Sequence, residues 1–226
     1  MQKQSQTVLV VAPHPDDETL GVGATLLKHH KNGDRLFWLI MTSVTDDSNF
    51  TAEFRTKRTQ EIKEVSRMYG FQKTLELPFR PTRLDTYPRG DLVSSVSKVI
   101  QEVKPDTLYI PNRSDVHTDH RITFEVMMAC SKSFRYPFLK RVLMYETPSE
   151  TDAVPPSREE AFIPNVFVDV EEFFEQKIKI MSLYTSEVGK HPFPRSPETL
   201  RALAAYRGSL AHMKQAEAFC LLKELC

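Results

Sequence analysis

Residues 8–21 read VLVVAPHPDDETLG, and this stretch decides the fold. The apolar run from Val8 to Ala12 is short and rich in β-branched residues, which predicts a strand covered on both faces. Pro13 ends the run, and a histidine and three acidic residues follow it. A buried strand therefore delivers an imidazole and several carboxylates to a single turn, and such a turn can hold a divalent metal beside a general base.

A second polar cluster, DVHTDH, occupies residues 115–120. It directly follows another apolar stretch, residues 107–111, which is also expected to be a strand. In a parallel sheet, ligands bind beyond the carboxyl ends of the strands, at the point where the strand order reverses. Because both clusters follow strands, we expect them to meet at one edge of the molecule.

Strands and helices alternate along the rest of the chain. Further strands are expected at residues 34–42, 73–77, 141–146 and 166–170, helices at 19–32, 53–69, 91–103, 122–131, 171–183 and 198–225, and irregular segments at 43–54, 147–164 and 187–197. This order predicts an α/β fold, a Rossmann-like three-layer sandwich with a mostly parallel sheet and an active site at the carboxyl ends of its strands. A length of 226 residues suits a single domain, residues 1–226.

Composition excludes several classes of protein. Hydrophobic residues make up 40% and charged residues 27%, and the formal net charge is zero, so neither nucleic acid nor a membrane surface is an expected partner. No stretch approaches the ~20 apolar residues of a membrane span. The three cysteines are widely spaced and form no disulfide framework, which favours reduced thiols and a cytoplasmic location. A homo-oligomer is compatible with this sequence.

Each polar cluster also has a simpler explanation. Acids near a helix N-terminus are favoured by ~0.3–1 kcal/mol each, which accounts for Glu18 but leaves His14 unexplained. The second cluster, taken alone, could be a solvated loop. The two clusters together favour a site, because each follows a predicted strand.

A catalytic zinc needs three protein ligands and an open position. His14, one of the two residues Asp16 and Asp17, and one of the two residues His117 and His120 would supply two imidazoles and one carboxylate. Spacing alone does not decide within either pair. The side chains left over are free for acid–base chemistry.

The motifs HPDDE at residues 14–18 and HTDH at residues 117–120 together resemble those of the LmbE-like, or PIG-L, family of zinc-dependent N-deacetylases. Arg58 and Glu61 are similar to the family's Arg-x-x-Glu pattern, and residues 177–186 and 215–219 are similar to its closing region. The resemblance implies a hydrolase that removes the acetyl group from an N-acetylated, GlcNAc-type sugar or glycoside by means of metal-activated water.

The resemblance also implies the metal ligands. These are His14, Asp17 and His120, and the ion is Zn²⁺. Fe²⁺ or another divalent ion in the cell is an alternative, since affinity order alone does not fix which metal occupies a site.

The same resemblance implies the catalytic roles. Asp16 is the expected general base, and His117, held by Asp119, is the expected cationic partner of the oxyanion and the leaving amine. Arg58 is expected to contact the substrate. A simpler explanation for Arg58 is a solvated helix face with charge pairs worth a few tenths of a kcal/mol.

Two other functions are compatible with the clusters. One is a metal-dependent phosphoesterase, because Asp and His clusters also build two-metal sites. The other is a non-catalytic binding protein on the same fold. The segment 43–49 and the residues Thr118 and Glu187 depart from common family patterns, so the acceptor sugar stays open. Residues 43–49 are expected to border the substrate.

Overall fold

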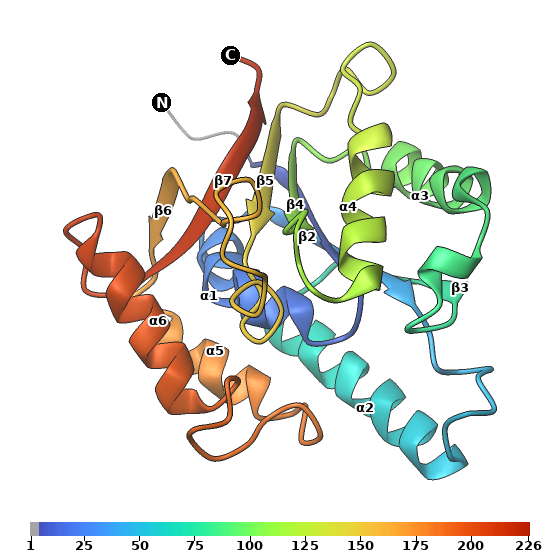
Figure 1. Cartoon of the computed structure of the whole chain (residues 1–226). Helices are drawn as coiled ribbons and strands as arrows, with labels where there is room; N and C mark the ends of the chain where they lie inside the picture. The colour runs from blue at the N-terminus through green and yellow to red at the C-terminus, as the bar shows by residue number, and fades with distance from the viewer. Residues whose placement is uncertain (1–4) are drawn as a thin grey trace.

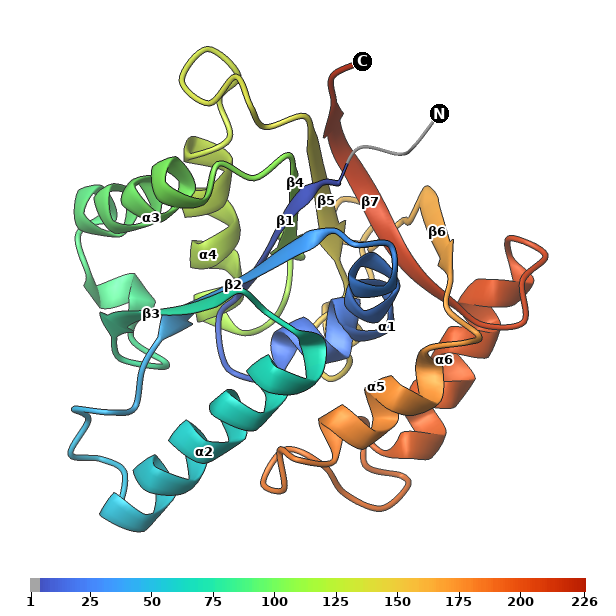
Figure 2. The ribbon, with the colours of Figure 1, turned by 180° about the vertical axis from the view of Figure 1, so that it is seen from behind.

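The computed structural model describes residues 5–226 and contains a seven-stranded sheet between two layers of helices (Figure 1 and Figure 2). The strand order is β3-β2-β1-β4-β5-β7-β6. The strands are β1 (Thr7–Ala12), β2 (Arg35–Thr42), β3 (Lys73–Phe79), β4 (Thr107–Pro111), β5 (Arg141–Tyr145), β6 (Val166–Asp169) and β7 (Ala216–Glu224). Strands β1 to β5 are parallel, and β7 is antiparallel to both of its neighbours. The predicted α/β class with a mostly parallel sheet is confirmed.

The helices divide between the two faces of this sheet. They are α1 (Asp17–Lys31), α2 (Ala52–Tyr69), α3 (Arg89–Val103), α4 (Thr118–Ala129), α5 (Phe174–Met181) and α6 (Pro197–Ser209), with a short 3₁₀ helix η1 (Leu84–Thr86). Helices α3 and α4 cover one face, and the other four cover the opposite face (Figure 1 and Figure 2). Each layer of helices has its own apolar core against the sheet.

Strand β1 shows why its sequence is continuously apolar. Val8, Val10 and Ala12 pack into the core shared with α1 and α2, whereas Leu9 and Val11 pack into the core shared with α3 and α4. All five side chains are fully buried. Because successive residues of a strand point to opposite faces, a strand covered on both sides needs apolar residues at every position.

The two polar clusters lie where the strand order reverses. Strand β1 pairs with β2 on one side and with β4 on the other. The later strands β2 and β3 therefore lie on one side of β1, and β4 and β5 lie on the other. The first cluster follows β1 and the second follows β4. Their meeting at one edge of the sheet is therefore confirmed.

The second cluster extends into a helix. Helix α4 was expected to begin at residue 122, but it begins at Thr118, and His117 is its N-cap residue. His120 consequently lies in the first helical turn, with its side chain buried.

The expected helix at residues 198–225 is wrong in its second half. Helix α6 ends at Ser209, and residues 216–224 form β7, which hydrogen-bonds to β5 and β6. Many side chains of this segment favour helices, but the open edges of two strands supply pairing that outweighs local propensity. The chain turns back closely here, since a Cβ on Gly208 would lie 2.6 Å from the Met213 carbonyl oxygen.

The expected irregular segments agree with the structure except at two ends: residues 52–54 of the segment 43–54 belong to α2, and Pro197 of the segment 187–197 is the first residue of α6. Residues 147–164 and 187–196 contain turns and bends but neither helix nor strand. Within residues 5–226, no helix is long and apolar enough to cross a membrane.

Candidate active site

The turn after β1 is strained and is held by side chains. Asp16 has a φ of 141°, a value that costs a non-glycine residue ~1–3 kcal/mol. Two hydrogen bonds oppose this cost, because the Asp16 N–H donates to Glu18 Oε2 at 3.0 Å and the His14 N–H donates to Asp17 Oδ2 at 2.9 Å. The carboxylates of Asp17 and Glu18 therefore stabilise the backbone of this turn.

Two imidazoles converge on the Asp17 carboxylate. His14 Nδ1 lies 3.5 Å from Asp17 Oδ2, and His120 Nε2 lies 3.4 Å from the same oxygen. The far nitrogen of each ring meets another carboxylate: His14 Nε2 lies 2.9 Å from Asp119, and His120 Nδ1 lies 2.8 Å from Asp115. Carboxylates in this position orient metal-binding histidines and raise their basicity.

Among residues 5–226, two groups of side chains offer ligand atoms within 4.8 Å of one another, and the distances distinguish them. The first is His14, Asp17 and His120, and the second is His14, His117 and Asp119. Around a tetrahedral zinc with bonds of about 2.0–2.1 Å, ligand atoms stand about 3.3–3.4 Å apart. The distances of 3.4 and 3.5 Å in the first group fit this geometry, whereas the 2.9 Å between His14 and Asp119 is a hydrogen-bond length. The first group could hold a zinc ion.

Charge at these ligands follows from their contacts. Burial disfavours the charged forms of His14 and Asp17. Hydrogen bonds with Asp119 and Asp17 nevertheless raise the pKa of His14 to about 10. The neighbouring His120 and His14 outweigh burial at Asp17 and hold its pKa below the usual range. Asp17 is therefore an ionised carboxylate, the form that a metal ligand needs, whereas His14 is protonated in this structure and would release that proton on binding a metal.

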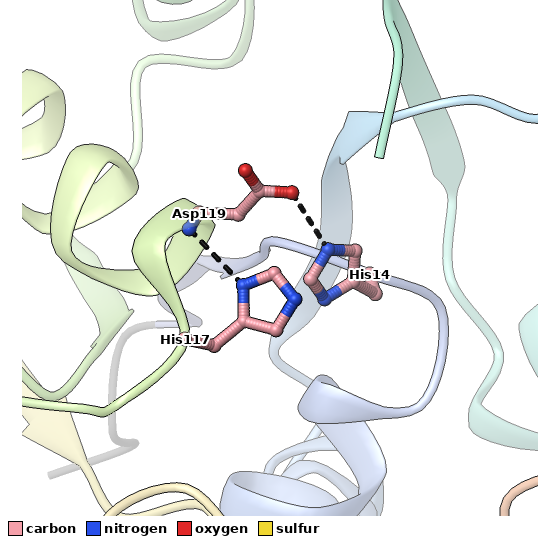
Figure 3. Close-up of side chains that lie close together, drawn as sticks. All are labelled: His14, His117 and Asp119. Atoms are coloured by element: carbon pink, nitrogen blue, oxygen red, sulfur yellow. Dashed lines mark hydrogen bonds and ion pairs between the residues drawn. The ribbon is translucent and has the colours of Figure 1, made fainter. Parts of the chain in front are cut away.

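Asp119 contacts two histidines, His14 and the predicted partner His117, but not through the expected atoms. Figure 3 shows its carboxylate directed to His14 and its backbone nitrogen directed to His117. The expectation was that the Asp119 carboxylate holds His117. Because His117 is the N-cap of α4, its ring turns toward a free N–H of the first helical turn instead.

This contact determines which ring nitrogen of neutral His117 carries the proton. The backbone N–H of Asp119 can only donate, so His117 Nδ1 accepts it at 3.1 Å and a neutral ring carries its proton on Nε2. Burial, together with the nearby His14 and His120, lowers the pKa of His117 to about 4. The ring is therefore a neutral hydrogen-bond donor at pH 7 in this structure, and not the expected cation.

An arginine that sequence reasoning missed lies beside Asp16. Arg195 Nη1 donates to Asp16 Oδ2 at 2.7 Å, and the same guanidinium contacts Glu150 at 3.3 Å and Glu187 at 3.4 Å. Burial and the charge of Asp17 raise the pKa of Asp16, while Arg195 opposes them. Arg195 lies in a proline-rich loop without periodicity, so no local pattern marks it.

A cavity of about 230 Å³ joins these groups. His14, Asp16, Asp17, His117 and His120 all line it. The segment after β2 borders the cavity through its first residues, Ser43 and Val44, and through Phe50. The cavity lining contains five carboxylates, three imidazoles and two guanidiniums around one space of the size of a small ligand.

Comparisons with known proteins agree with this geometry. A sequence model of the PIG-L family, described as GlcNAc-PI de-N-acetylase, matches residues 9–131. The chain belongs to this family. The matched segment contains both polar clusters, and the resemblance seen in their residues is confirmed.

Relatives extend the similarity over most of the chain. Diacetylchitobiose deacetylase of Thermococcus kodakarensis is 26% identical over 219 residues, which are 93% of this chain and 80% of that protein. A probable N-acetyl-alpha-D-glucosaminyl L-malate deacetylase of Bacillus anthracis is 24% identical over 194 residues, which are 82% and 83% of the two chains. The structure of N,N'-diacetylchitobiose deacetylase from Pyrococcus horikoshii has a TM-score of 0.78 at 23% identity and covers 97% of this chain and 85% of its own, a likeness in fold.

Arg58 of this family member is buried. It is 6% exposed, and it donates to the Pro15 carbonyl, to Ser186 Oγ and to Glu187 Oε1, while Nε lies 3.2 Å from Glu61. The alternative of a solvated helix face is therefore wrong for Arg58 and Glu61. Arg58 also lines the cavity, so a contact with substrate stays a prediction.

The closing region supports helix α1 through a buried ion pair. Glu217 accepts hydrogen bonds from the backbone N–H groups of Ala24 and Thr25, and Lys177 donates to the Leu20 carbonyl. In a regular helix, the Ala24 N–H would bond to the Leu20 carbonyl. Lys177 and Glu217 lie 2.7 Å apart, and each adds one side-chain contact to one of these two backbone groups. They thereby anchor the helix whose first turn holds Asp17.

Proposed function

We propose that this chain is a zinc-dependent deacetylase that hydrolyses the N-acetyl group of a GlcNAc-type sugar or glycoside. The observation that carries the proposal is the convergence of His14, Asp17 and His120 at ligand spacing beside Asp16 in one cavity. Membership of a de-N-acetylase family supports the reaction class. The names of the relatives support an N-acetylated sugar as substrate.

His14, Asp17 and His120 would hold the ion, and Asp119 and Asp115 orient the two imidazoles. Bound zinc supplies a Lewis acid that makes water acidic and polarises the amide carbonyl. The donor set of two imidazoles and one carboxylate is a set that catalytic zinc sites use. Zn²⁺ is the proposed ion, and Fe²⁺ is the alternative that metal analysis must exclude.

Asp16 is the proposed general base. Arg195 occupies its Oδ2, which leaves Oδ1 to accept the proton of the attacking water. The raised pKa of Asp16, caused by burial and by Asp17, makes the carboxylate a stronger base than an exposed one. Arg195 limits its rotation, so Arg195 is a positioning residue.

His117 is the proposed donor to the substrate. Its Nε2–H can stabilise the negative charge that develops on the carbonyl oxygen and can supply the proton that the leaving amine needs. A neutral imidazole performs the first task as a hydrogen-bond donor. Loss of one such donor typically lowers the rate by about 10²–10³-fold.

The decisive experiment is acetate release from soluble N-acetylglucosamine glycosides by the purified protein. We expect turnover that disappears after treatment with a chelator and returns with one equivalent of zinc. Iron(II), added under anaerobic conditions, serves as the comparison metal. Release of acetate that is unaffected by complete metal removal would contradict the proposal.

A phosphoesterase and a non-catalytic binding protein are tested in the same assay. Phosphate release from phosphomonoesters, with no acetate from any glycoside, would favour the first. Binding of N-acetylated sugars without acetate release would favour the second.

We also propose a cytoplasmic location. Cys130, Cys220 and Cys226 are all free thiols, and reduced cysteines are typical of proteins in reducing compartments. Cell fractionation with an antibody against the protein tests this location.

A further inference from the structure

One wall of the cavity is apolar and aromatic. Phe50 and Phe54 stack with their ring centroids 5.1 Å apart and their planes 19° from parallel. Both line the cavity, together with Val44 and Ile62. Phe50 precedes α2 and Phe54 lies in its first turn, where the Thr51 side chain caps the helix through the Phe54 N–H. A hydrogen bond therefore fixes the backbone that carries this aromatic pair.

The positive charges of the cavity are already neutralised. Arg195 contacts the carboxylates of Asp16, Glu150 and Glu187. Arg58 contacts those of Glu61 and Glu187, and its guanidinium also lies 5.4 Å from the Phe54 ring centre. Neither guanidinium offers a free pair of donors to a further carboxylate or phosphate, and such a bidentate pair is how arginine recognises these groups.

Carboxylates also outnumber guanidiniums around the cavity. Five acids line it, Asp16, Asp17, Glu76, Glu150 and Glu187, against the two arginines. These carboxylates offset the positive charge of the two arginines and of a divalent cation at the metal site. A bound group with its own negative charge would meet like charges, which cost several kcal/mol at close range.

We propose that the group attached to the reacting N-acetyl sugar is an uncharged ring that rests on Phe50 and Phe54, and that glycosides of acids are disfavoured. A second sugar ring has both features that this cavity suits: an apolar face for the aromatic pair and hydroxyl groups for the carboxylates that line the same cavity. The inference rests on the proposed function and names the substrate class of the same site.

The test compares three glycosides of N-acetylglucosamine: the methyl glycoside, the disaccharide N,N'-diacetylchitobiose and the malic acid glycoside. We expect kcat/KM for the disaccharide to exceed that for the malic acid glycoside at least tenfold. Equal or faster turnover of the malic acid glycoside would overturn the inference while the deacetylase function stands. If none of the three releases acetate, the proposed function itself fails.

Variants locate the preference in the cavity. Phe54→Ala is expected to lower kcat/KM about tenfold for the disaccharide and less than threefold for the methyl glycoside. Phe134→Ala, which removes a phenylalanine that is 79% exposed and outside the cavity lining, is the matched control and should change neither value. An equal loss on both substrates in Phe54→Ala would refute the role of the aromatic pair.

A charge variant gives an independent readout. Glu150→Gln is expected to raise the relative kcat/KM of the malic acid glycoside severalfold, because it removes one negative charge from the lining. Glu102→Gln, at a glutamate that is 52% exposed and outside the lining, is the control. An unchanged ratio in Glu150→Gln would show that the carboxylates do not select against acids.

Discussion

The segment from β1 to α4 and the segment from β6 to β7 contribute to the site in different ways. The first contains the three candidate metal ligands, which follow the carboxyl ends of β1 (Ala12) and β4 (Pro111). The second contributes none of these ligands, but Arg195 reaches Asp16 across 179 residues and Glu217 reaches the backbone of α1 across 193. The candidate metal ligands therefore come from the two sequence motifs, whereas some of the residues that hold Asp16 and α1 in place come from a distant part of the chain.

The largest expected effect comes from a ligand in the first segment. His14→Ala should lose the metal and all measurable activity, because two ligands rarely hold a catalytic zinc. Elemental analysis after dialysis measures the metal content. His212→Asn is the control, since His212 is exposed and asparagine tolerates its positive φ. Full zinc content in His14→Ala would contradict the assignment of His14 as a metal ligand in the first segment.

Asp16→Asn should separate binding from chemistry in the same turn. The amide keeps a contact with Arg195 but cannot accept a proton, so we expect a fall in kcat of about 10²–10⁴-fold with the metal retained. Metal content and acetate release are measured on the same preparation, which checks both the retained metal and the reduced kcat. Wild-type kcat in this variant would remove Asp16 from the mechanism.

The second segment is tested by Lys177→Met. Both members of the Lys177–Glu217 pair are 5% exposed, so removal of the lysine leaves a buried, unpaired carboxylate and should cost about 3–5 kcal/mol of folding free energy. Urea unfolding measures the loss. Lys31→Met is the matched control, because its partner Glu172 and Lys31 are 64% and 58% exposed, and it should cost less than about 1 kcal/mol. A similar result for both variants would mean that this support is unimportant.

Asp115→Asn should have a smaller effect on the metal. Asp115 is fully buried and its carboxylate orients His120, so we expect metal affinity to fall about 10–100-fold with the fold intact. Competition with a chromogenic chelator gives the affinity. Asp119→Asn should give a loss in the same range through His14. If Asp115→Asn binds metal as tightly as the wild type, His120 is oriented by its helix alone.

The smallest effects concern two helical glycines. A Cβ at Gly21 would lie 2.2 Å from the Tyr145 ring, so Gly21→Ala should destabilise the protein by about 1–3 kcal/mol. A Cβ at Gly90 has nothing within 4 Å, so Gly90→Ala should be neutral or stabilise by up to about 1 kcal/mol. Thermal unfolding distinguishes these outcomes, and a harmless Gly21→Ala would show that α1 can move away from β5.

Several features of the site could be predicted because their signals are local. The run from Val8 to Ala12 marks a buried strand, and the residues after it carry their chemistry in their own side chains. The boundary of α4 was missed because His117 is an unusual N-cap, although its ring nitrogen accepts a backbone N–H as a capping oxygen would. The pairing of Asp119 with His14 rather than with His117 follows from that capped conformation.

The sequence by itself determined which types of side chain each cluster offers, the position of each cluster after a strand and the parallel α/β class, because these depend on residue type and short-range periodicity. Only the tertiary structure decided that residues 216–224 form a strand, that Arg195 faces Asp16 and that Arg58 is buried. The physical reason is that strand pairing and buried ion pairs are formed with partners far along the chain. The free energy of these long-range interactions exceeds local helix or strand propensity, and a short sequence pattern does not reveal the distant partner.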